Sequence, residues 1–212
     1  MKIRNGFVSN SSSSSFILKL PHYPSSYEDM KKMLLGDENP LVLPHCYGND
    51  AFPTKQVIEV IYRDVIDALG QSRDNSVESV SGEEFSISEY SLDEYDNKIT
   101  SSNREEYNSL KRQYKMIVKD LKDAYSERNN RISLDKNNDN TIDNELINSL
   151  YNQEDEIGNK MGELIIKSIK EKSLVTDVFV TLSYSDNDGA LYSFIEHGDI
   201  LNPITISRIS HH

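Results

Sequence analysis

Residues 102–126 read SNREEYNSLKRQYKMIVKDLKDAYS, and this stretch decides how the chain is organised. Its apolar side chains recur at alternating intervals of three and four residues, at Tyr107, Leu110, Tyr114, Ile117, Leu121 and Ala124. That spacing is the heptad pattern of a helix that packs along one face against another helix. Ser102 and Glu105 can form a capping box at its start. Charged residues fill its outer positions, as expected of a solvated face: Lys111, Arg112, Lys119, Asp120, Lys122 and Asp123.

A second helical pattern lies between residues 142 and 169. Its apolar positions are Ile142, Leu146, Leu150, Ile157, Met161, Leu164, Ile165 and Ile169. Asp143 and Glu145 lie in its first turn, where carboxylates suit the positive end of the helix dipole. The two patterns predict an antiparallel helical hairpin over residues 101–173. Heptads this short are compatible with pairing within one chain or between two chains.

Both ends of the chain have strand composition. Residues 16–20 and 203–207 are rich in residues that favour strands. Residues 177–195 predict a β-hairpin around Asp188-Gly189, a dipeptide that is typical of tight hairpin turns. We predict that these strands form one antiparallel sheet, to which both ends of the chain contribute.

One amphipathic helix is predicted to pack on this sheet, between Thr54, which can cap a helix, and Gly70, which can end one. Its apolar positions are Val57, Ile58, Ile61, Tyr62, Val65, Ile66 and Leu69. The predicted fold class is therefore α+β, with an antiparallel sheet packed on a core helix and the long hairpin inserted between the strands. We expect a core domain of residues 1–100 plus 174–212, and a hairpin insertion of residues 101–173.

A shorter helix is predicted near the amino terminus. Ser25 to Glu28 is a candidate capping box at its start, and Gly36 can end it. The residues that follow, 37–52, contain several Pro and Gly turn signals and are expected to be mostly loop.

The segment of residues 71–97 is strongly acidic, with eight Asp and Glu residues against one Arg. Within it, residues 85–88 alternate between apolar and polar side chains, like a short edge strand. The segment can be a solvated acidic loop that contains one strand, or a strip that mimics phosphates or faces cations.

Composition excludes several classes of protein. The chain has 212 residues and a formal net charge of −12, which argues against a general nucleic-acid binder and is compatible with a basic partner. Cys46 is the only cysteine, so neither an internal disulfide nor a four-cysteine zinc site can form. No apolar stretch approaches the roughly 18 residues of a membrane helix. Residues 1–15 lack the apolar core of a secretory signal.

A serine run precedes the first predicted strand and consists of Ser11, Ser12, Ser13, Ser14 and Ser15. Such a run can be a flexible linker, a closely packed strand or turn, or an anion-binding site made of amides and hydroxyls. No Gly-x-Ser-x-Gly pattern surrounds it, so we do not predict a serine nucleophile.

Residues 4–17, RNGFVSNSSSSSFI, resemble the amino-terminal strings of small proteins of tailed bacteriophages and of some of their bacterial hosts. The resemblance implies a viral origin. Because that group has no established biochemical activity, the resemblance supplies no catalytic residue.

The loop between the two long helices resembles an EF-hand calcium loop, with Asp135, Asn137 and Asp139 at its first three ligand positions. It departs from that pattern at Asn140, where a glycine is needed, and at Leu146, where a bidentate Glu is needed. A tight calcium site is therefore not expected. The loop can be a polar turn, a weak divalent-cation site or a contact with a partner. The expected contact residues are Asp135, Asn137, Asp139, Asp143 and Glu145.

One further group could hold a transition metal, namely Asp186, Asp188 and His197. These residues lack the spacing of any common metal-binding motif, so a structural role is the preferred interpretation. We expect no cofactor beyond a weakly bound divalent cation.

These features favour a non-enzymatic, phage-encoded accessory protein that binds a host or viral protein through its acidic surface and its helical-hairpin arm. The alternatives are a minor virion structural protein and a metal-dependent phosphoesterase or nuclease. The expected location is the host cytoplasm, or the virion for the first alternative. Self-association through the hairpin is compatible with the sequence, whereas membrane binding and direct nucleic-acid binding are not expected.

Overall fold

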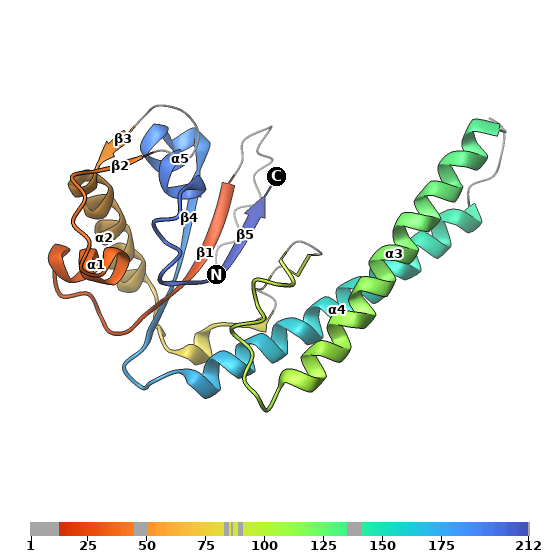
Figure 1. Cartoon of the computed structure of the whole chain (residues 1–212), viewed down its shortest axis with the longest axis horizontal. Helices are drawn as coiled ribbons and strands as arrows, with labels where there is room; N and C mark the ends of the chain where they lie inside the picture. The colour runs from red at the N-terminus through yellow and green to blue at the C-terminus, as the bar shows by residue number, and fades with distance from the viewer. Residues whose placement is uncertain are drawn as a thin grey trace. The chain divides into compact units, whose positions relative to one another are not determined.

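The computed structural model describes residues 13–44, 51–82, 85, 87, 88, 91–134 and 141–211 (Figure 1). The protein is α+β, and its antiparallel sheet uses strands from both ends of the chain, as predicted. The chain divides into two compact units, Met1–Ser79 with Leu174–His212 and Val80–Ser173. The first unit contains the sheet and the second contains the two long helices. None of the described helices is both long and apolar enough to cross a membrane.

The sheet of the first unit has the strand order β4-β1-β5, with β1 (Ser13–Leu20) in the centre. β4 (Val178–Ser185) and β5 (Thr205–His211) both pair antiparallel with β1. Phe16 lies opposite Leu182 on one side and Arg208 on the other. β1 begins three residues before the predicted strand, so the last three serines of the run belong to the sheet.

The core of the first unit lies between this sheet and α2 (Thr54–Gln71). The predicted core helix is present, and five of its predicted apolar positions form the buried face, whereas Tyr62 and Ile66 are only partly buried. The central buried residues are Phe16, Leu18, Leu20, Val57, Ile58, Ile61, Val65 and Leu69. Burying each such aliphatic side chain contributes about 1.5–3 kcal/mol, so this seam is the main source of stability in the unit.

The ends of α2 differ slightly from the prediction. Thr54 is the first residue of the helix rather than its cap, and it is buried because its hydroxyl donates to the carbonyl oxygen of Pro40 at 2.6 Å. The helix continues past Gly70 to Gln71 and is followed by the short 3-10 helix η1 (Val77–Ser79).

The region between the first two helices contains more regular structure than predicted. α1 (Tyr27–Leu35) ends at Gly36, as predicted, where φ of 62° favours glycine. Residues 37–52 are predicted to be mostly loop. Instead, β2 (Val42–Pro44) and β3 (Ala51–Pro53) pair antiparallel in a small second sheet.

The prediction of a second hairpin strand after Gly189 is wrong, because residues 190–197 form the helix α5 (Ala190–His197). β4 is followed by the 3-10 helix η3 (Asp186–Asp188). Leu191, Phe194 and Ile195 recur at helical spacing, and the last two are buried in the core. The third strand of the sheet is β5, which pairs with β1.

The second unit is built on α3 (Arg104–Leu134) and α4 (Thr141–Lys172), which pack against each other within one chain and run side by side in Figure 1. The predicted apolar positions are buried at Tyr107, Leu110, Tyr114 and Leu121 of α3 and at Leu150, Ile157, Met161, Leu164, Ile165 and Ile169 of α4. One position is wrong. Leu146 is 53% exposed, and its neighbour Ile147 packs with Leu121 and Leu150 instead.

The compact unit that contains the hairpin begins at Val80, and the domain division predicted at residue 100 stays a prediction. The close packing depends on Gly82 and Gly162, since a Cβ atom added to Gly162 would lie 2.3 Å from the carbonyl oxygen of Gly82. The strand predicted at 85–88 is absent from the described part of that range. Phe85 is buried instead, with its ring 5.9 Å from that of Tyr95.

Candidate functional site

The predicted contact residues at the hairpin tip are only partly described. Asp135, Asn137 and Asp139 lie outside the described residues. Asp143 lies in the first turn of α4, and its side chain is also outside the described part of the chain. Glu145 is exposed on the same helix. A role for the tip in cation or partner binding therefore stays a prediction.

The outer part of the hairpin, residues 116–134 of α3 and 141–155 of α4, is here called the distal arm. Among its described side chains, the buried core is small and consists of Leu121, Ile147 and Leu150, with partly buried neighbours on α3. Large apolar side chains are exposed on the same stretch, namely Met116 (66%), Leu146 (53%) and Tyr151 (43%). Exposed side chains of this kind lose water when a partner covers them, so they can supply binding energy.

Two tyrosines join the helices of the distal arm near its surface. The rings of Tyr125 and Tyr151 meet edge to face with centroids 6.3 Å apart, and their hydroxyl oxygens are 2.9 Å apart. Such a pair fixes the two helices relative to each other while leaving Tyr151 accessible. The two helices of the distal arm are thus held together at their surface by this tyrosine pair, and few of their described side chains are buried.

The inner part of the hairpin is here called the base. It consists of residues 104–115 of α3 and 156–172 of α4, with the described residues between 80 and 99 packed on them. Tyr107 is fully buried and donates its hydroxyl proton to the carbonyl oxygen of Leu92 at 3.0 Å. Burial raises the pKa of Tyr107. The hydroxyl of Tyr114 lies 3.0 Å from the carbonyl oxygen of Ile87 and 2.7 Å from Oε1 of Glu154. These contacts hold the acidic segment on the hairpin.

A cation of α3 is neutralised by this segment. Nζ of Lys111 lies 2.7 Å from Oδ1 of Asp93 and 2.9 Å from Oδ2 of Asp96. The hydrogen bond from Lys111 holds the pKa of Asp93 below its usual range. Burial lowers the pKa of Lys111, but the bonds to the two carboxylates outweigh that effect and raise it. Part of the acidic segment therefore faces a cation of its own chain.

The residue predicted to cap α3 has a different role. Ser102 donates its hydroxyl proton to Oε2 of Glu171 at 2.9 Å, across the base of the hairpin. Asn103 is buried, and its Nδ2 donates to the hydroxyl of Ser168 at 2.9 Å. Hydrogen bonds from Thr100 and Ser102 lower the pKa of Glu171. This network closes the base and was not indicated by the sequence pattern.

The serine run lies partly within the sheet. Ser11 and Ser12 are outside the described residues, whereas Ser13, Ser14 and Ser15 are in β1. Ser14 is fully buried and donates its hydroxyl proton to Oε1 of Glu196 at 3.0 Å, while the Ser15 hydroxyl lies 2.9 Å from that of Ser183 on β4. This arrangement fits the closely packed strand among the three interpretations of the run.

Glu196 gives this polar cluster its charge. The side chain is fully buried, and its Oε2 has no hydrogen-bond partner among the described residues. Nη2 of Arg208 donates to the Ser14 hydroxyl at 3.3 Å, and Nε2 of His197 lies 3.9 Å from Oε2 of Glu196. The Ser14 hydroxyl is thus already engaged by a carboxyl group and by a guanidinium group of the same chain.

The predicted transition-metal group is only partly described. Asp188 is exposed in η3, and His197 is half-buried at the end of α5. The side chain of Asp186 lies outside the described part of the chain. Within the described residues, no three His, Cys, Asp or Glu side chains are grouped to hold a metal ion. This metal site therefore stays a prediction.

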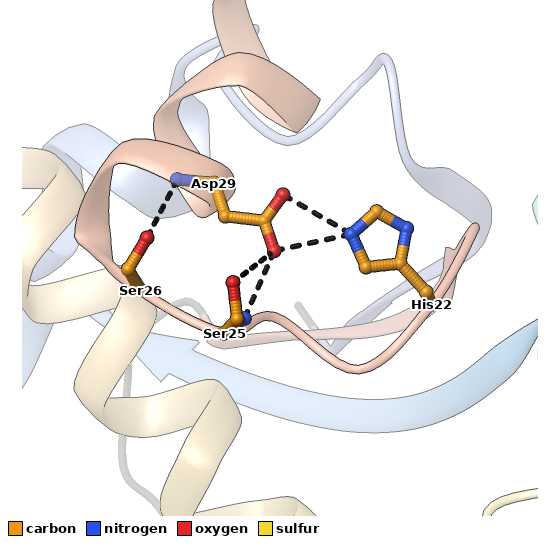
Figure 2. Close-up of polar contacts among 4 residues, drawn as sticks. All are labelled: His22, Ser25, Ser26 and Asp29. Carbon is orange, nitrogen blue, oxygen red and sulfur yellow. Dashed lines mark hydrogen bonds and ion pairs between the residues drawn. The ribbon is translucent and has the colours of Figure 1, made fainter.

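A second polar group, shown in Figure 2, lies at the start of α1. Nε2 of His22 is 3.1 Å from both carboxylate oxygens of Asp29, and Oδ2 of Asp29 also accepts from the backbone N–H of Ser25 at 2.9 Å. The hydroxyl of Ser26 accepts from the Asp29 N–H, so Ser26 is the helix cap in place of the predicted Ser25. The N–H of Ser25, more than His22, lowers the pKa of Asp29. The group resembles a Ser-His-Asp set but serves to cap the helix.

The chain was compared with protein families, with curated proteins and with solved structures. Residues 4–17, whose resemblance to phage proteins stays a prediction, are described only from residue 13 onward. Their likeness therefore concerns sequence and carries no site geometry. No family model, no curated protein and no solved structure matches the chain.

Proposed function

We propose that this chain is a non-enzymatic accessory protein that binds a host or viral protein through its helical-hairpin arm and acidic surface. The resemblance of residues 4–17 implies that it is phage-encoded, and it would then act in the host cytoplasm. The observation that carries the proposal is the contrast between the exposed apolar side chains of the distal arm and its small core.

Support comes first from the composition of the distal arm. Met116, Leu146 and Tyr151 are all exposed by 43% or more, on a stretch whose described side chains include only a few buried ones. A helical pair with so little interior gains little stability from its own packing. Met and Tyr are also residue types that are enriched where proteins meet. Contact with a partner is the function that best accounts for keeping these side chains at the surface.

Support comes also from the base. The hydroxyls of Tyr107 and Tyr114 tie α3 to the carbonyl groups of Leu92 and Ile87, and the amide of Asn103 donates to Ser168 of α4. An arm that is anchored in this way loses less conformational entropy when it binds, because its helices are already in place. Pre-organisation of this kind suits recognition of another protein.

The phosphoesterase alternative is less well supported. It requires the serine run to hold phosphate, and Ser14 is bonded to the buried carboxylate of Glu196. The guanidinium group of Arg208 also donates to this hydroxyl, so Ser14 is already engaged within the chain. The binding proposal needs no such arrangement.

Site-specific photo-crosslinking tests the proposal on the full-length chain. A benzophenone amino acid is placed at Met116 or Tyr151 in the distal arm, and at Lys55 or Glu59 on the exposed face of α2 as matched controls. Crosslinking is performed in lysate of infected and of uninfected host cells.

We expect the same partner to be crosslinked from both arm positions and from neither α2 position. A partner crosslinked only from α2, or no partner at any position in either lysate, would contradict the proposal. Mass spectrometry of the product distinguishes a host protein from a viral one.

A further inference from the structure

The outward face of α3 carries a stripe of cations. Arg112, Lys115, Lys119 and Lys122 follow one another at intervals of three, four and three residues, and all four side chains are exposed. On a helix of 3.6 residues per turn, this spacing places them within about 80° of one face. We call them the basic stripe. It runs from the end of the base into the distal arm.

The two long helices differ in charge. α3 contains eight Lys and Arg residues against five Asp and Glu, whereas α4 contains four against seven. The net charge of −12 on the whole chain therefore conceals a basic surface on α3.

A contact inside the chain, next to the basic stripe, indicates the chemistry that suits this face of α3. Lys111, one turn before Lys115, holds Asp93 and Asp96 at 2.7 and 2.9 Å. The positive charge of Lys115 also contributes to lowering the pKa of Asp93, after the larger effect of Lys111. The acidic segment thus docks at the amino-terminal end of the same helix face, and the basic stripe continues beyond it.

We propose that Arg112, Lys115, Lys119 and Lys122 form the docking surface for an acidic segment of the partner protein. This docking proposal rests on the proposed function, because it names the chemistry by which the arm would recognise its partner. The partner segment extends along α3 the contact that Asp93 and Asp96 begin at Lys111. The stripe spans about 15 Å, which is the length of some ten residues of an acidic helix or some five of an extended acidic peptide.

An acidic protein segment fits this surface better than a nucleic acid does. The affinity of a protein for a nucleic acid depends on how many phosphates its cations neutralise. Four cations can neutralise only a few phosphates, so the stripe would bind a nucleic acid weakly. Asp120 and Asp123 border the stripe on α3. These carboxylates would repel a long polyphosphate that extends past the stripe, whereas a short peptide can avoid them.

Fluorescence anisotropy on the full-length chain tests the proposal at low ionic strength. The probe is a labelled peptide with the sequence of residues 83–97, which contains six Asp and Glu residues. Two further probes are the same peptide with every Glu and Asp replaced by Gln and Asn, and an oligothymidylate of equal charge. The stripe variant combines Arg112→Gln, Lys115→Gln, Lys119→Gln and Lys122→Gln. The matched control makes the same charge change at four exposed cations elsewhere, with Lys32→Gln, Lys55→Gln, Arg73→Gln and Lys167→Gln.

We expect the stripe variant to lose about tenfold in affinity for the acidic peptide, because four exposed ion pairs are removed together. The control variant should lose less than about twofold, and the amide peptide should not bind. Equal losses in the two variants, or no binding of the acidic peptide by the unmodified chain, would overturn the proposal. Tighter, stripe-dependent binding of the oligothymidylate would overturn it in favour of a nucleic acid. Circular dichroism checks the fold of both variants, and the pair Lys119→Gln with Lys122→Gln replaces the stripe variant if that one unfolds.

The crosslinking experiment separates this proposal from the one on which it rests. If Met116 still crosslinks the partner with equal yield in the stripe variant, the stripe is not the docking surface, although the arm still binds. If no arm position crosslinks a partner, the proposed function fails, whatever the peptide does.

Discussion

The base and the distal arm of the hairpin are parts of the same two helices, yet they are stabilised in different ways. The base buries Tyr107, Tyr114 and Met161 and adds hydrogen bonds to residues 80–99. The distal arm has a much smaller core and exposes Met116 and Tyr151. The heptad spacing is nevertheless the same in both parts.

The difference shows that a heptad pattern predicts which face of a helix is buried without showing what covers it. In the base, a third segment packs on the two helices and neutralises one of their cations. In the distal arm, the corresponding surface is left to solvent or to a partner. The predictions below test this contrast, in order of decreasing expected effect.

The largest effect is expected from removing a buried ring of the base. Tyr107→Ala should lower the free energy of unfolding by about 3–5 kcal/mol, because it leaves a cavity where a fully buried aromatic side chain was. Tyr151→Ala in the distal arm should cost no more than about 1 kcal/mol, since that ring is 43% exposed. Urea unfolding followed by circular dichroism measures both. Equal losses would mean that base and arm are packed alike.

The next effect concerns two glycines of α4. Gly162→Ala should destabilise the protein by about 1–3 kcal/mol, because the new Cβ would collide with the carbonyl oxygen of Gly82 at 2.3 Å. Gly158→Ala is the matched control, with its nearest neighbour at 3.8 Å, and should stabilise the helix by about 0.5–1 kcal/mol. Thermal unfolding of the two variants distinguishes them by the sign of the shift in Tm. A stabilising Gly162→Ala would refute the close packing of residues 80–99 on the base.

A smaller effect should follow pH. The pKa of Asp93 is lowered by Lys111, so this contact stabilises the fold above the ordinary pKa of the carboxyl and is lost as the pH falls through the lowered value. The difference in Tm between the unmodified chain and Lys111→Met should therefore be constant near neutral pH and shrink below about pH 4. Lys119→Met serves as the control and should show no such change. A pH-independent difference for Lys111→Met would show that the ion pair does not hold the segment.

The smallest effect is expected at the outer end of α4. Leu146→Gln should change stability by no more than about 0.5 kcal/mol, because the side chain is 53% exposed. Ile147→Gln should destabilise the distal arm clearly, since Ile147 is 4% exposed and packs with Leu121. Chemical unfolding of both variants gives the comparison. A larger loss of stability for Leu146→Gln than for Ile147→Gln would support the helix register that was predicted from sequence.

Local periodicity was sufficient to predict much of the fold. The buried face of α2 and most of the apolar seam of α3 follow directly from residues spaced by three and four. It was insufficient where two structures satisfy the same short pattern. Residues 190–197 contain apolar side chains that suit a strand or a helix, and Leu146 and Ile147 are adjacent apolar residues of which only one can face α3.

The site contacts depend on residues that are distant in sequence. Ser14 and Glu196 are 182 residues apart, and nothing near either one indicates that they meet. Lys111 looks like any solvated helix cation until residues 80–99 are seen to pack beside it. Gly82 and Gly162 are likewise informative only as a pair. Such contacts are properties of the folded chain, which local sequence does not encode.

The most direct test of the account is hydrogen exchange of the full chain with and without its crosslinked partner. We predict that the partner slows exchange at the backbone amides of residues 112–122 and at neighbouring amides of the distal arm. The base should already be protected in the free chain, because its hydrogen bonds are buried. Slower exchange confined to the sheet of the first unit, with α3 unchanged, would contradict the claim that the arm binds the partner.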